Sequence, residues 1–346
     1  MKSRLLLYAM MMSFHFCLHA QLLTDTDSIL MRQEADGFLR SMPSGLQNGQ
    51  LHAVVSAIAG EPSELDRVRN SRNSVSPISE NVRTRDFQIE GAAGCKISLR
   101  LYYPKGLDSQ DLPLLVYFHG GGWTFGSINS CSRFCDAVAS LGNTAVLAVD
   151  YSLAPERPFP DGLNDCIAAV DYAFAHSAEL GIDPQRISVG GDSSGGNLAL
   201  AAALTRSHSS PSLRLLVLFY PVVRAESDDT GSWQQYGKGY GLDSALMDAF
   251  NKAYLCNGVS SDDYRVSPVY ASDEQLTGLP PVLMIGAERD ILTSQGQEFA
   301  ARLHKLGVDI KHIILPGTVH LFITVAGQER AFNKSVELTV SFLNQK

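Results

Sequence analysis

Positively charged residues are scarce in this sequence of 346 residues, which has 28 lysines and arginines against 36 acidic residues and a formal net charge of −8 at pH 7. Nucleic acids and anionic membranes attract basic surfaces, so neither is expected as a partner. The sequence also lacks internal repeats and low-complexity tracts. This absence argues against a repeat array, and the length is sufficient for one large hydrophobic core.

The sequence has little that could span a membrane. An apolar run from Leu5 to Leu18 follows Lys2 and Arg4 and is closed by Ala20. This layout is typical of a secretory signal, so residues 1–20 are predicted to be a signal peptide and the protein to be secreted or periplasmic. An uncleaved anchor is the alternative, but the run is short for a spanning helix, so no stable membrane insertion is expected. Cleavage would leave 26 basic against 36 acidic residues, a net charge of −10.

Cysteine is also sparse and gives no sign of a metal site. Cys17 lies in the predicted signal, and the five remaining cysteines are an odd number, so at least one thiol stays unpaired within the chain. Cys131 and Cys135 are four residues apart in a predicted helix and would share a face. No second cysteine or histidine pair stands at zinc-ligand spacing, which favours packing or a local disulfide. No metal or cofactor is expected.

The hydrophobic pattern predicts an α/β fold. Residues 21–78 have helical spacing and end in a polar segment near Ser71–Pro77, the best candidate for a boundary with a domain over 79–346. From Arg85 the period changes to two around the Gly91–Gly94 turn, which predicts a hairpin. Buried-strand runs then follow at 114–118, 145–149, 187–189, 215–219, 282–285 and 310–315.

Segments of helical length separate most of these runs, for example 164–180 and 197–205. This alternation predicts a mostly parallel central sheet flanked by helices on both faces. Residues 222–268 do not follow it and are interpreted as an insertion over the strand ends. Ligands bind beyond the carboxyl ends of parallel strands, so the loops after the strands are the places to look for chemistry.

The loop after the 187–189 strand contains a serine between two glycines. Gly191, Ser193 and Gly195 fit the pattern GxSxG between a strand and a helix, the context in which this pattern presents a nucleophile. The sharp turn leaves room only for glycine two residues before and two residues after the serine. Ser194 lacks this glycine spacing, so Ser193 is predicted to be the nucleophile and Ser194 to supply a backbone N–H.

A second glycine-rich turn, His119-Gly120-Gly121-Gly122-Trp123, follows the 114–118 strand. Such a turn lets the backbone present N–H groups to a developing oxyanion, and one donor of this kind is worth roughly 10²–10³ in rate. Either loop alone would be weak evidence. Together they supply complementary parts of one site.

A serine hydroxyl needs a base, and a base needs an acid to orient it. Of the nine histidines, His320 alone follows a late strand on a loop that should reach Ser193. The acid should come from the loop after the 282–285 strand, where Glu288 and Asp290 both stand. The order serine, acid, histidine is met by either carboxylate.

At this point the sequence resembles the hormone-sensitive-lipase-like branch of esterases, which are α/β hydrolases with a helical cap. The resemblance covers residues 113–346 and rests on HGGGW at 119–123, DYSLAPE at 150–156, GDSSGGN at 191–197 and HLF at 320–322. It implies Asp290 as the acid, the amides of Gly120, Gly121 and Ser194 as the oxyanion hole, and a cap made of the amino-terminal helices and the 222–268 insertion. Trp123 is expected to contact substrate.

The sequence departs from the family pattern at five positions. Ser152 stands for arginine, Ser194 for alanine and Leu321 for glycine, while Ile291 and Ser294 stand for a proline and an aspartate of the acid loop. None removes a reacting group. They affect the anchoring of the acid loop and the width of the pocket.

The resulting hypothesis is a serine carboxylesterase that hydrolyses short- to medium-chain esters. Ser193 acts as the nucleophile, His320 as base and acid, and Asp290 as the orienting residue. An amidase or peptidase, or a small-molecule binding protein on the same fold, are the alternatives, because fold alone does not determine function. The partner is then a small-molecule ester, and a homodimer is compatible with the sequence.

Overall fold

The computed structural model describes residues 23–91, 94–107, 111–207 and 209–345. The predicted signal peptide, residues 1–20, therefore lies outside the described residues. Within them, no helix is both long enough and apolar enough to cross a membrane.

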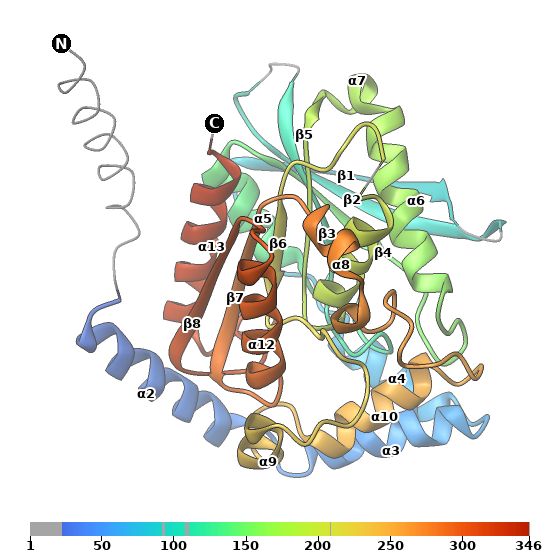
Figure 1. Ribbon diagram of the computed structural model, residues 1–346, viewed down its shortest axis with the longest axis vertical. Helices are drawn as coiled ribbons and strands as arrows, with labels where there is room; N and C mark the ends of the chain where they lie inside the picture. The colour runs from blue at the N-terminus through green and yellow to red at the C-terminus, as the bar shows by residue number, and fades with distance from the viewer. Residues whose placement is uncertain (1–22, 92–93, 108–110, 208, 346) are drawn as a thin grey trace.

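An eight-stranded sheet forms the centre of the molecule, in the order β1-β2-β4-β3-β5-β6-β7-β8 (Figure 1). The strands are β1 (Val82–Glu90), β2 (Lys96–Pro104), β3 (Leu112–Phe118), β4 (Ala145–Asp150), β5 (Ile182–Asp192), β6 (Leu216–Phe219), β7 (Val282–Arg289) and β8 (Ile310–Val319). β1 pairs antiparallel with β2, and β2 antiparallel with β4. All other neighbouring strands are parallel, so the mostly parallel sheet and the hairpin are confirmed.

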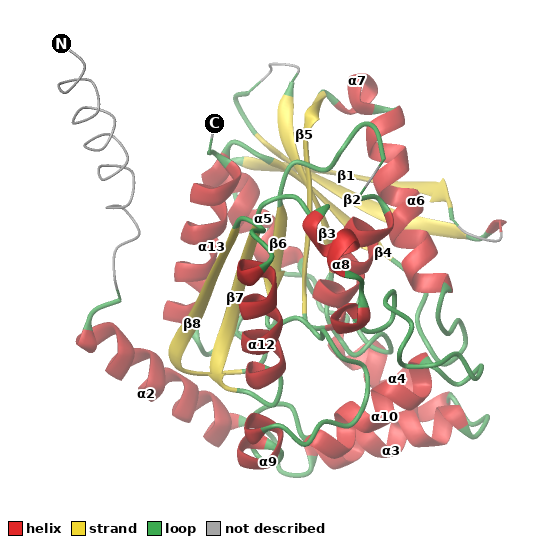
Figure 2. Ribbon diagram, in the orientation of Figure 1, coloured by secondary structure: helices red, strands yellow, loops and turns green. Residues whose placement is uncertain are grey.

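Helices cover both faces of this sheet, as the alternating pattern predicted (Figure 2). Along β3, Leu114, Val116 and Phe118 belong to one buried cluster and Leu115 and Tyr117 to another. The first cluster includes side chains of α6 (Asp161–Ala175), α8 (Ser194–Thr205) and α12 (Thr293–Lys305). The second includes side chains of α5 (Ser132–Gly142) and α13 (Glu329–Leu343). Such burial on two faces requires the continuous apolar runs seen in the sequence.

Five further helices gather beyond the carboxyl ends of the parallel strands (Figure 1). They are α2 (Asp25–Ser41), α3 (Leu46–Ile58) and α4 (Ser63–Arg72) from the amino-terminal part, and α9 (Gly231–Tyr236) and α10 (Ser244–Tyr254) from the insertion. Helix α3 packs against both α4 and α10. The side chain of Gln47 joins the two segments, because it donates to Gly241 O at 2.8 Å and accepts from Asp243 N at 3.3 Å. We call this group of helices the cap.

Two helices differ from the sequence prediction at their ends. The segment 164–180 forms α6 and a separate α7 (Ser177–Leu180), because His176 leaves the helical conformation at φ −113° and ψ 21°. Helix α8 begins at Ser194 rather than at 197, directly after the turn at Ser193. The remaining short helices, α11 (Asp273–Thr277) and the 3₁₀ helix η2 (Pro268–Tyr270), follow the insertion.

Cys131 and Cys135 are free thiols, and both are buried. Of the two expectations for this pair, packing or a local disulfide, packing is the one observed. Cys131 directly precedes α5 and Cys135 lies within it. Burial raises the pKa of the Cys135 thiol, which keeps it protonated and unreactive.

Asn197 ties both ends of the insertion to the central helix α8. Its buried side-chain amide donates to Val222 O at 2.9 Å and to Val266 O at 2.9 Å. Removal of the donor leaves buried carbonyl oxygens without a partner, which costs about 1–3 kcal/mol per group. We therefore expect Asn197→Ala to lower the free energy of unfolding by about 2 kcal/mol, as measured by urea denaturation.

Asn344→Ala is the matched control, because Asn344 is exposed and its side chain has no hydrogen bond among the described residues. Equal unfolding midpoints for the two variants would contradict the role given to Asn197.

Candidate active site

Ser193 occupies a strained turn between β5 and α8. Its backbone has φ 54° and ψ −119°, a conformation that costs a residue with a side chain about 1–3 kcal/mol. The Ser193 N–H donates to Phe219 O at 2.9 Å, which holds the turn against β6. A Cβ atom at Gly191 would collide with the backbone of Gly195, and one at Gly195 with Phe118 O. The glycines of the pattern are therefore required by close packing of the backbone.

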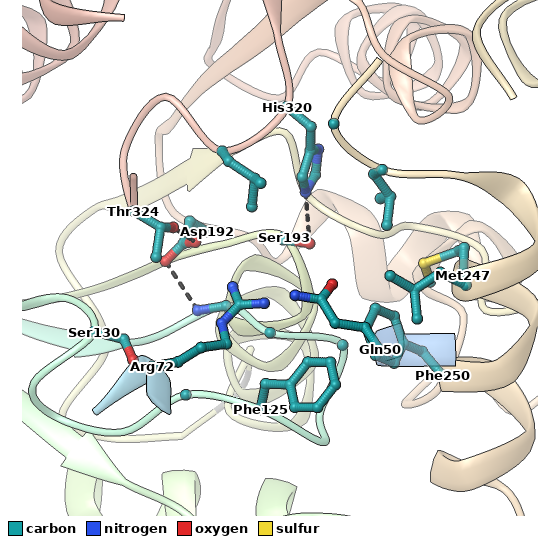
Figure 3. A pocket seen from close by; sticks show the side chains of 18 of the residues that line it. Gln50, Arg72, Phe125, Ser130, Asp192, Ser193, Met247, Phe250, His320 and Thr324 are labelled. Carbon is teal, nitrogen blue, oxygen red and sulfur yellow. Dashed lines mark hydrogen bonds between the residues drawn. The ribbon is translucent and has the colours of Figure 1, made fainter. Parts of the chain in front are cut away.

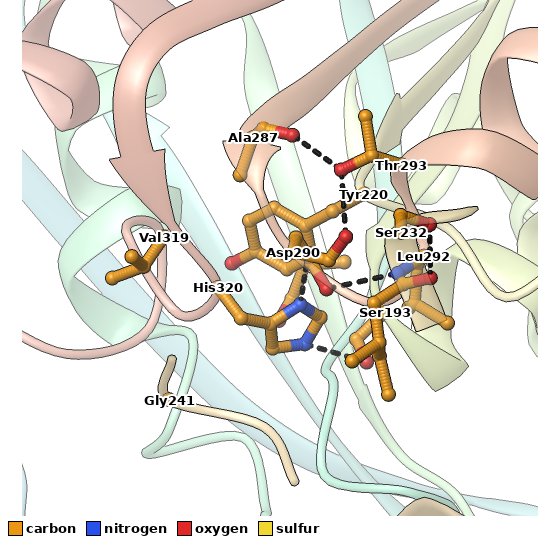
Figure 4. Close-up of polar contacts among 12 residues, drawn as sticks. Ser193, Tyr220, Ser232, Gly241, Ala287, Asp290, Leu292, Thr293, Val319 and His320 are labelled. Carbon is orange, nitrogen blue, oxygen red and sulfur yellow. Dashed lines mark hydrogen bonds and ion pairs between the residues drawn. The ribbon is translucent and has the colours of Figure 1, made fainter. Parts of the chain in front are cut away.

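His320 links Ser193 to Asp290 (Figure 4). Its Nε2 lies 3.1 Å from Ser193 Oγ, and its Nδ1 lies 2.5 Å from Asp290 Oδ2. The second carboxylate oxygen, Oδ1, accepts from Leu292 N at 3.1 Å. All three side chains are buried. With a proton on Nδ1 facing the carboxylate, Nε2 is free to accept the hydroxyl proton of Ser193.

Glu288, the other acid of this loop, has a different set of partners. Its carboxylate accepts from the backbone N–H of Gly317 and lies 3.3 Å from the guanidinium of Arg32. It thereby fixes the turn within β8 that leads to His320. The geometry thus distinguishes two carboxylates that the order of residues alone did not.

Two residues that the sequence did not indicate hold His320 in place. The buried Gln328 donates to His320 O at 3.1 Å and to Val319 O at 3.2 Å, and accepts from Val319 N at 3.0 Å. The ring of Tyr220 lies 4.4 Å from the imidazole ring, and its hydroxyl accepts from Ile323 N at 3.2 Å. Neither residue belongs to a recognisable motif, because each acts through contacts that are distant in sequence.

The glycine-rich loop lies beside Ser193, but its first amide is engaged differently from the expectation. Gly120 N donates to Asp192 Oδ1 at 3.0 Å, so this N–H is not available to an oxyanion. The amides of Gly121, Gly122 and Ser194 have no such acceptor in the described part of the chain. Gly122, which the sequence analysis did not select, therefore replaces Gly120 among the candidate donors. Both Gly121 and Gly122 adopt positive φ, at 127° and 61°.

Asp192 joins the glycine-rich loop, strand β3 and the loop after His320 at this site. Its carboxylate accepts from Gly120 N at 3.0 Å, from the Tyr117 hydroxyl at 3.0 Å and from the Thr324 hydroxyl at 2.8 Å. Burial raises the pKa of Asp192, and these three donors oppose the shift. Asp192 therefore positions the glycine-rich loop relative to Ser193.

His119 begins the glycine-rich loop and supports it from inside. Its ring stacks on Tyr151 with centroids 4.3 Å apart, and the Tyr151 hydroxyl donates to His119 O at 2.6 Å. Burial lowers the pKa of His119, so its imidazole stays neutral. It has no contact with Ser193 that would let it serve as the base.

A pocket opens above Ser193 between the glycine-rich loop and the cap (Figure 3). One apolar wall comes from the insertion, and the cap helices α3 and α4 add polar side chains to those of the loops around Ser193. The apolar residues that the insertion contributes are Leu242, Leu246, Met247 and Phe250.

Trp123, expected to contact substrate, does not line this pocket. Its backbone has φ 57°, and its indole is buried, stacked on Tyr254 of α10 with centroids 4.3 Å apart. The left-handed conformation turns the side chain into the core, where it supports the cap. The expected role of Trp123 is therefore corrected from substrate contact to packing.

Departures from the family pattern also find local explanations. Ser294 accepts from Ser232 N at 3.1 Å and donates its own N–H to Ser232 Oγ at 3.0 Å, so α9 anchors the acid loop. Ser152 donates to the Asp165 carboxylate through N–H and hydroxyl, at 3.0 and 2.5 Å. Leu321 has φ 75°, a value that favours glycine, and lines the pocket.

Among residues 23–345 as described, no cluster of three or more histidines, cysteines or acids is arranged to hold a metal ion. The side chains that are hydrogen-bonded in series at this site are those of Ser193, His320 and Asp290.

Comparisons with known proteins place this chain among α/β hydrolases. The family described as "alpha/beta hydrolase fold" matches residues 115–324. A carboxylesterase from Mycobacterium tuberculosis is 36% identical over 66% of this chain and 72% of its own. An ethyl acetate hydrolase from Pseudomonas putida is 34% identical over 75% of this chain and 82% of its own.

Solved structures show the same fold. A thermostable esterase from Pseudomonas putida superposes with a TM-score of 0.75 at 26% identity, covering 90% of this chain and 95% of the other. Carboxyl esterase 2 from the fungus Tuber melanosporum gives a TM-score of 0.73 at 29% identity, covering 81% and 96%.

Replacement of Asp192 tests its positioning role. An asparagine side chain at this position would offer one acceptor oxygen to three donors, and a buried donor without a partner costs about 1–3 kcal/mol. We expect Asp192→Asn to lower the free energy of unfolding by at least about 1 kcal/mol and to speed hydrogen exchange at Gly120. Urea denaturation and exchange mass spectrometry measure the two effects.

The control is Asp262→Asn, since Asp262 is exposed and its side chain has no hydrogen bond among the described residues. Exchange rates at Gly120 that match those of the control would rule out the positioning role.

Proposed function

This chain belongs to the α/β-hydrolase family, in its hormone-sensitive-lipase-like branch, and we propose that it is a serine carboxylesterase. The observation that supports this proposal most directly is the hydrogen-bonded series Ser193, His320 and Asp290, of which Ser193 and His320 line a pocket. Relatives named carboxylesterase, ethyl acetate hydrolase and arylesterase support the same class of substrate.

In the first half of the reaction, Ser193 attacks the ester carbonyl carbon. His320 Nε2 takes the hydroxyl proton as the Oγ–C bond forms, and Asp290 stabilises the imidazolium through Nδ1. When the tetrahedral intermediate collapses, His320 returns this proton to the departing alkoxide. The products of this half are an acyl-serine and a free alcohol.

The negative charge on the intermediate is stabilised by backbone amides. The N–H groups of Gly121, Gly122 and Ser194 have no acceptor in the described part of the chain, so they are the donors offered to the carbonyl oxygen, since both loops adjoin Ser193. These donors are fixed before substrate arrives, so little reorganisation is needed when charge develops.

Water completes the reaction. His320, neutral again, removes a proton from a water molecule that attacks the acyl carbon, and then protonates Ser193 Oγ as the acid leaves. The Asp290 contact keeps the imidazole oriented through both halves. Every proton transfer in this cycle involves His320.

The apolar wall of the pocket favours a limited acyl or alcohol chain. Leu246, Met247 and Phe250 of α10 stand against the glycine-rich loop, and a Cβ at Gly122 would already collide with the Phe250 ring. This wall leaves room for short and medium chains, and a long chain would have to displace α10.

Ser193→Ala tests the nucleophile. Loss of the attacking oxygen should reduce turnover of p-nitrophenyl butyrate by about 10⁴-fold or more, measured by release of nitrophenolate. Ser194→Ala removes the neighbouring hydroxyl but keeps its backbone amide, and this variant should retain turnover. Undiminished activity in Ser193→Ala would refute the proposed function.

Because the side chains of α10 limit the pocket, kcat/KM should depend on the length of the acyl chain. We expect kcat/KM for p-nitrophenyl esters to rise from acetyl to butyryl or hexanoyl and to fall for palmitoyl. Met247→Ala should shift this optimum toward longer chains, because it opens the wall without touching Ser193. A steady rise toward long, emulsified substrates in the unaltered protein would contradict the expected size limit.

A further inference from the structure

Two polar side chains from the cap project into the pocket above Ser193 without a hydrogen-bond partner among the described residues. Arg72, the last residue of α4, and Gln50, in the middle of α3, both line the pocket that contains Ser193 and His320. Figure 3 shows the guanidinium and the amide directed toward the same space, with Asp192 and Ser193 drawn above them.

Arg72 differs sharply from the other arginine on the same face of α4. Arg69, one turn earlier, donates to Thr124 O at 2.8 Å, to Ala154 O at 2.9 Å and to the Glu156 carboxylate at 2.8 Å. Arg72 has no hydrogen bond and no ion pair among the described residues, and its guanidinium only lies over the Phe125 ring, 5.3 Å from the centroid. Burial lowers the pKa of Arg72 without any opposing acid.

No ion pair joins Arg72 to an acid of the described chain. Asp192 is the acidic residue among the described residues that line the pocket, but its carboxylate accepts from Tyr117, Gly120 and Thr324. The pocket therefore contains a cation whose counter-ion is not supplied by the described chain.

On α3, the side chains of Gln47 and Gln50 differ in the same way: the first has hydrogen-bond partners and the second has none in the described chain. The Gln47 amide is satisfied by Gly241 O and Asp243 N. Gln50 is 5% exposed, yet its amide has no partner in the described residues. The Gln50 amide and the Arg72 guanidinium both face the open space of the pocket, so one ligand could pair with both of them.

We propose that the substrate of this site contains an ionised carboxylate in addition to its ester, and that Arg72 and Gln50 bind this carboxylate while Ser193 attacks the ester. The inference rests on the proposed function. A guanidinium presents two parallel N–H donors that match the two oxygens of a carboxylate, and the Gln50 amide adds a third donor.

The position of Arg72 indicates how such a substrate lies. Arg72 also lines an outer, more open cleft with Met42, Asn129 and Arg133, so it stands where the inner pocket meets this cleft. The carboxylate then faces the cleft, the ester reaches Ser193, and the uncharged end contacts the apolar wall of α10. Monoesters of dicarboxylic acids and acylated hydroxy acids share this chemistry.

Two substrate pairs test the proposal. They also distinguish a carboxylate on the acyl side of the ester from one on the alcohol side. Monomethyl glutarate is compared with methyl 5-methylhexanoate, and 4-acetoxybutanoate with 4-methylpentyl acetate. Within each pair an isopropyl group replaces the carboxylate at nearly constant shape. The first pair places the charge on the acyl side of the ester and the second on the alcohol side. We expect kcat/KM to favour the charged member of at least one pair by about tenfold or more.

Variants then connect the preference to the two residues. Arg72→Met should lower the ratio of charged to neutral kcat/KM by about tenfold to a hundredfold, and Gln50→Met by about threefold to tenfold. Arg72→Lys keeps the charge but loses the paired donors, so its ratio should lie between. Arg83→Met is the matched control, because Arg83 also lies over an aromatic ring, that of Tyr103, but on strand β1 away from the site.

The outcomes separate this inference from the proposed function. Turnover of the neutral esters that depends on Ser193, with no preference for a carboxylate in either pair, would overturn the inference and leave the esterase proposal standing. Absence of turnover for all esters would overturn both. If Arg72→Met lacks a cooperative unfolding transition, Arg72→Lys and Gln50→Met decide the question, and unchanged ratios in both would reject the proposal.

Discussion

The left-handed backbone at Ser193 is the constraint on which the site depends. A residue with a side chain is held at φ 54° only because its surroundings leave no alternative. β6 accepts its N–H, and the glycines on either side allow β5, α8 and the end of β3 to approach more closely than any side chain would permit. The same turn points Oγ away from the sheet and toward His320. The strain is therefore the means by which the fold exposes one hydroxyl.

The other loops are adjusted to this turn by buried polar contacts rather than by rigid elements. Asp192, directly before Ser193, receives donors from the glycine-rich loop, from β3 and from the loop after His320. Gln328 fixes the backbone of His320, and Ser232 of the cap fixes the acid loop. Each contact joins separate segments of the chain, so displacement of one loop would be transmitted to the geometry around Ser193.

Because so many of these contacts join segments that are distant in sequence, only some features could be predicted from the sequence. The buried strands produce continuous apolar runs, and Ser193 and its glycines form a local pattern, so both were visible. Trp123 was misjudged because its side-chain direction follows from a backbone φ of 57° that no local pattern reveals. Gly120 was misjudged because its N–H is taken by a carboxylate 72 residues away. Long-range partners of this kind require the fold to be known.

The cap and the sheet loops contribute different groups to the site. The sheet loops provide Ser193, His320 and the backbone amides, the groups that the proposed reaction would use on any ester carbonyl. The cap provides a pocket with unlike walls, because the insertion contributes aliphatic and phenyl groups while α3 and α4 contribute Gln50 and Arg72. Such a division lets one catalytic centre keep its geometry while substrate choice is set elsewhere. A pocket apolar on one side and cationic on the other best fits a molecule that is itself apolar at one end and anionic at the other.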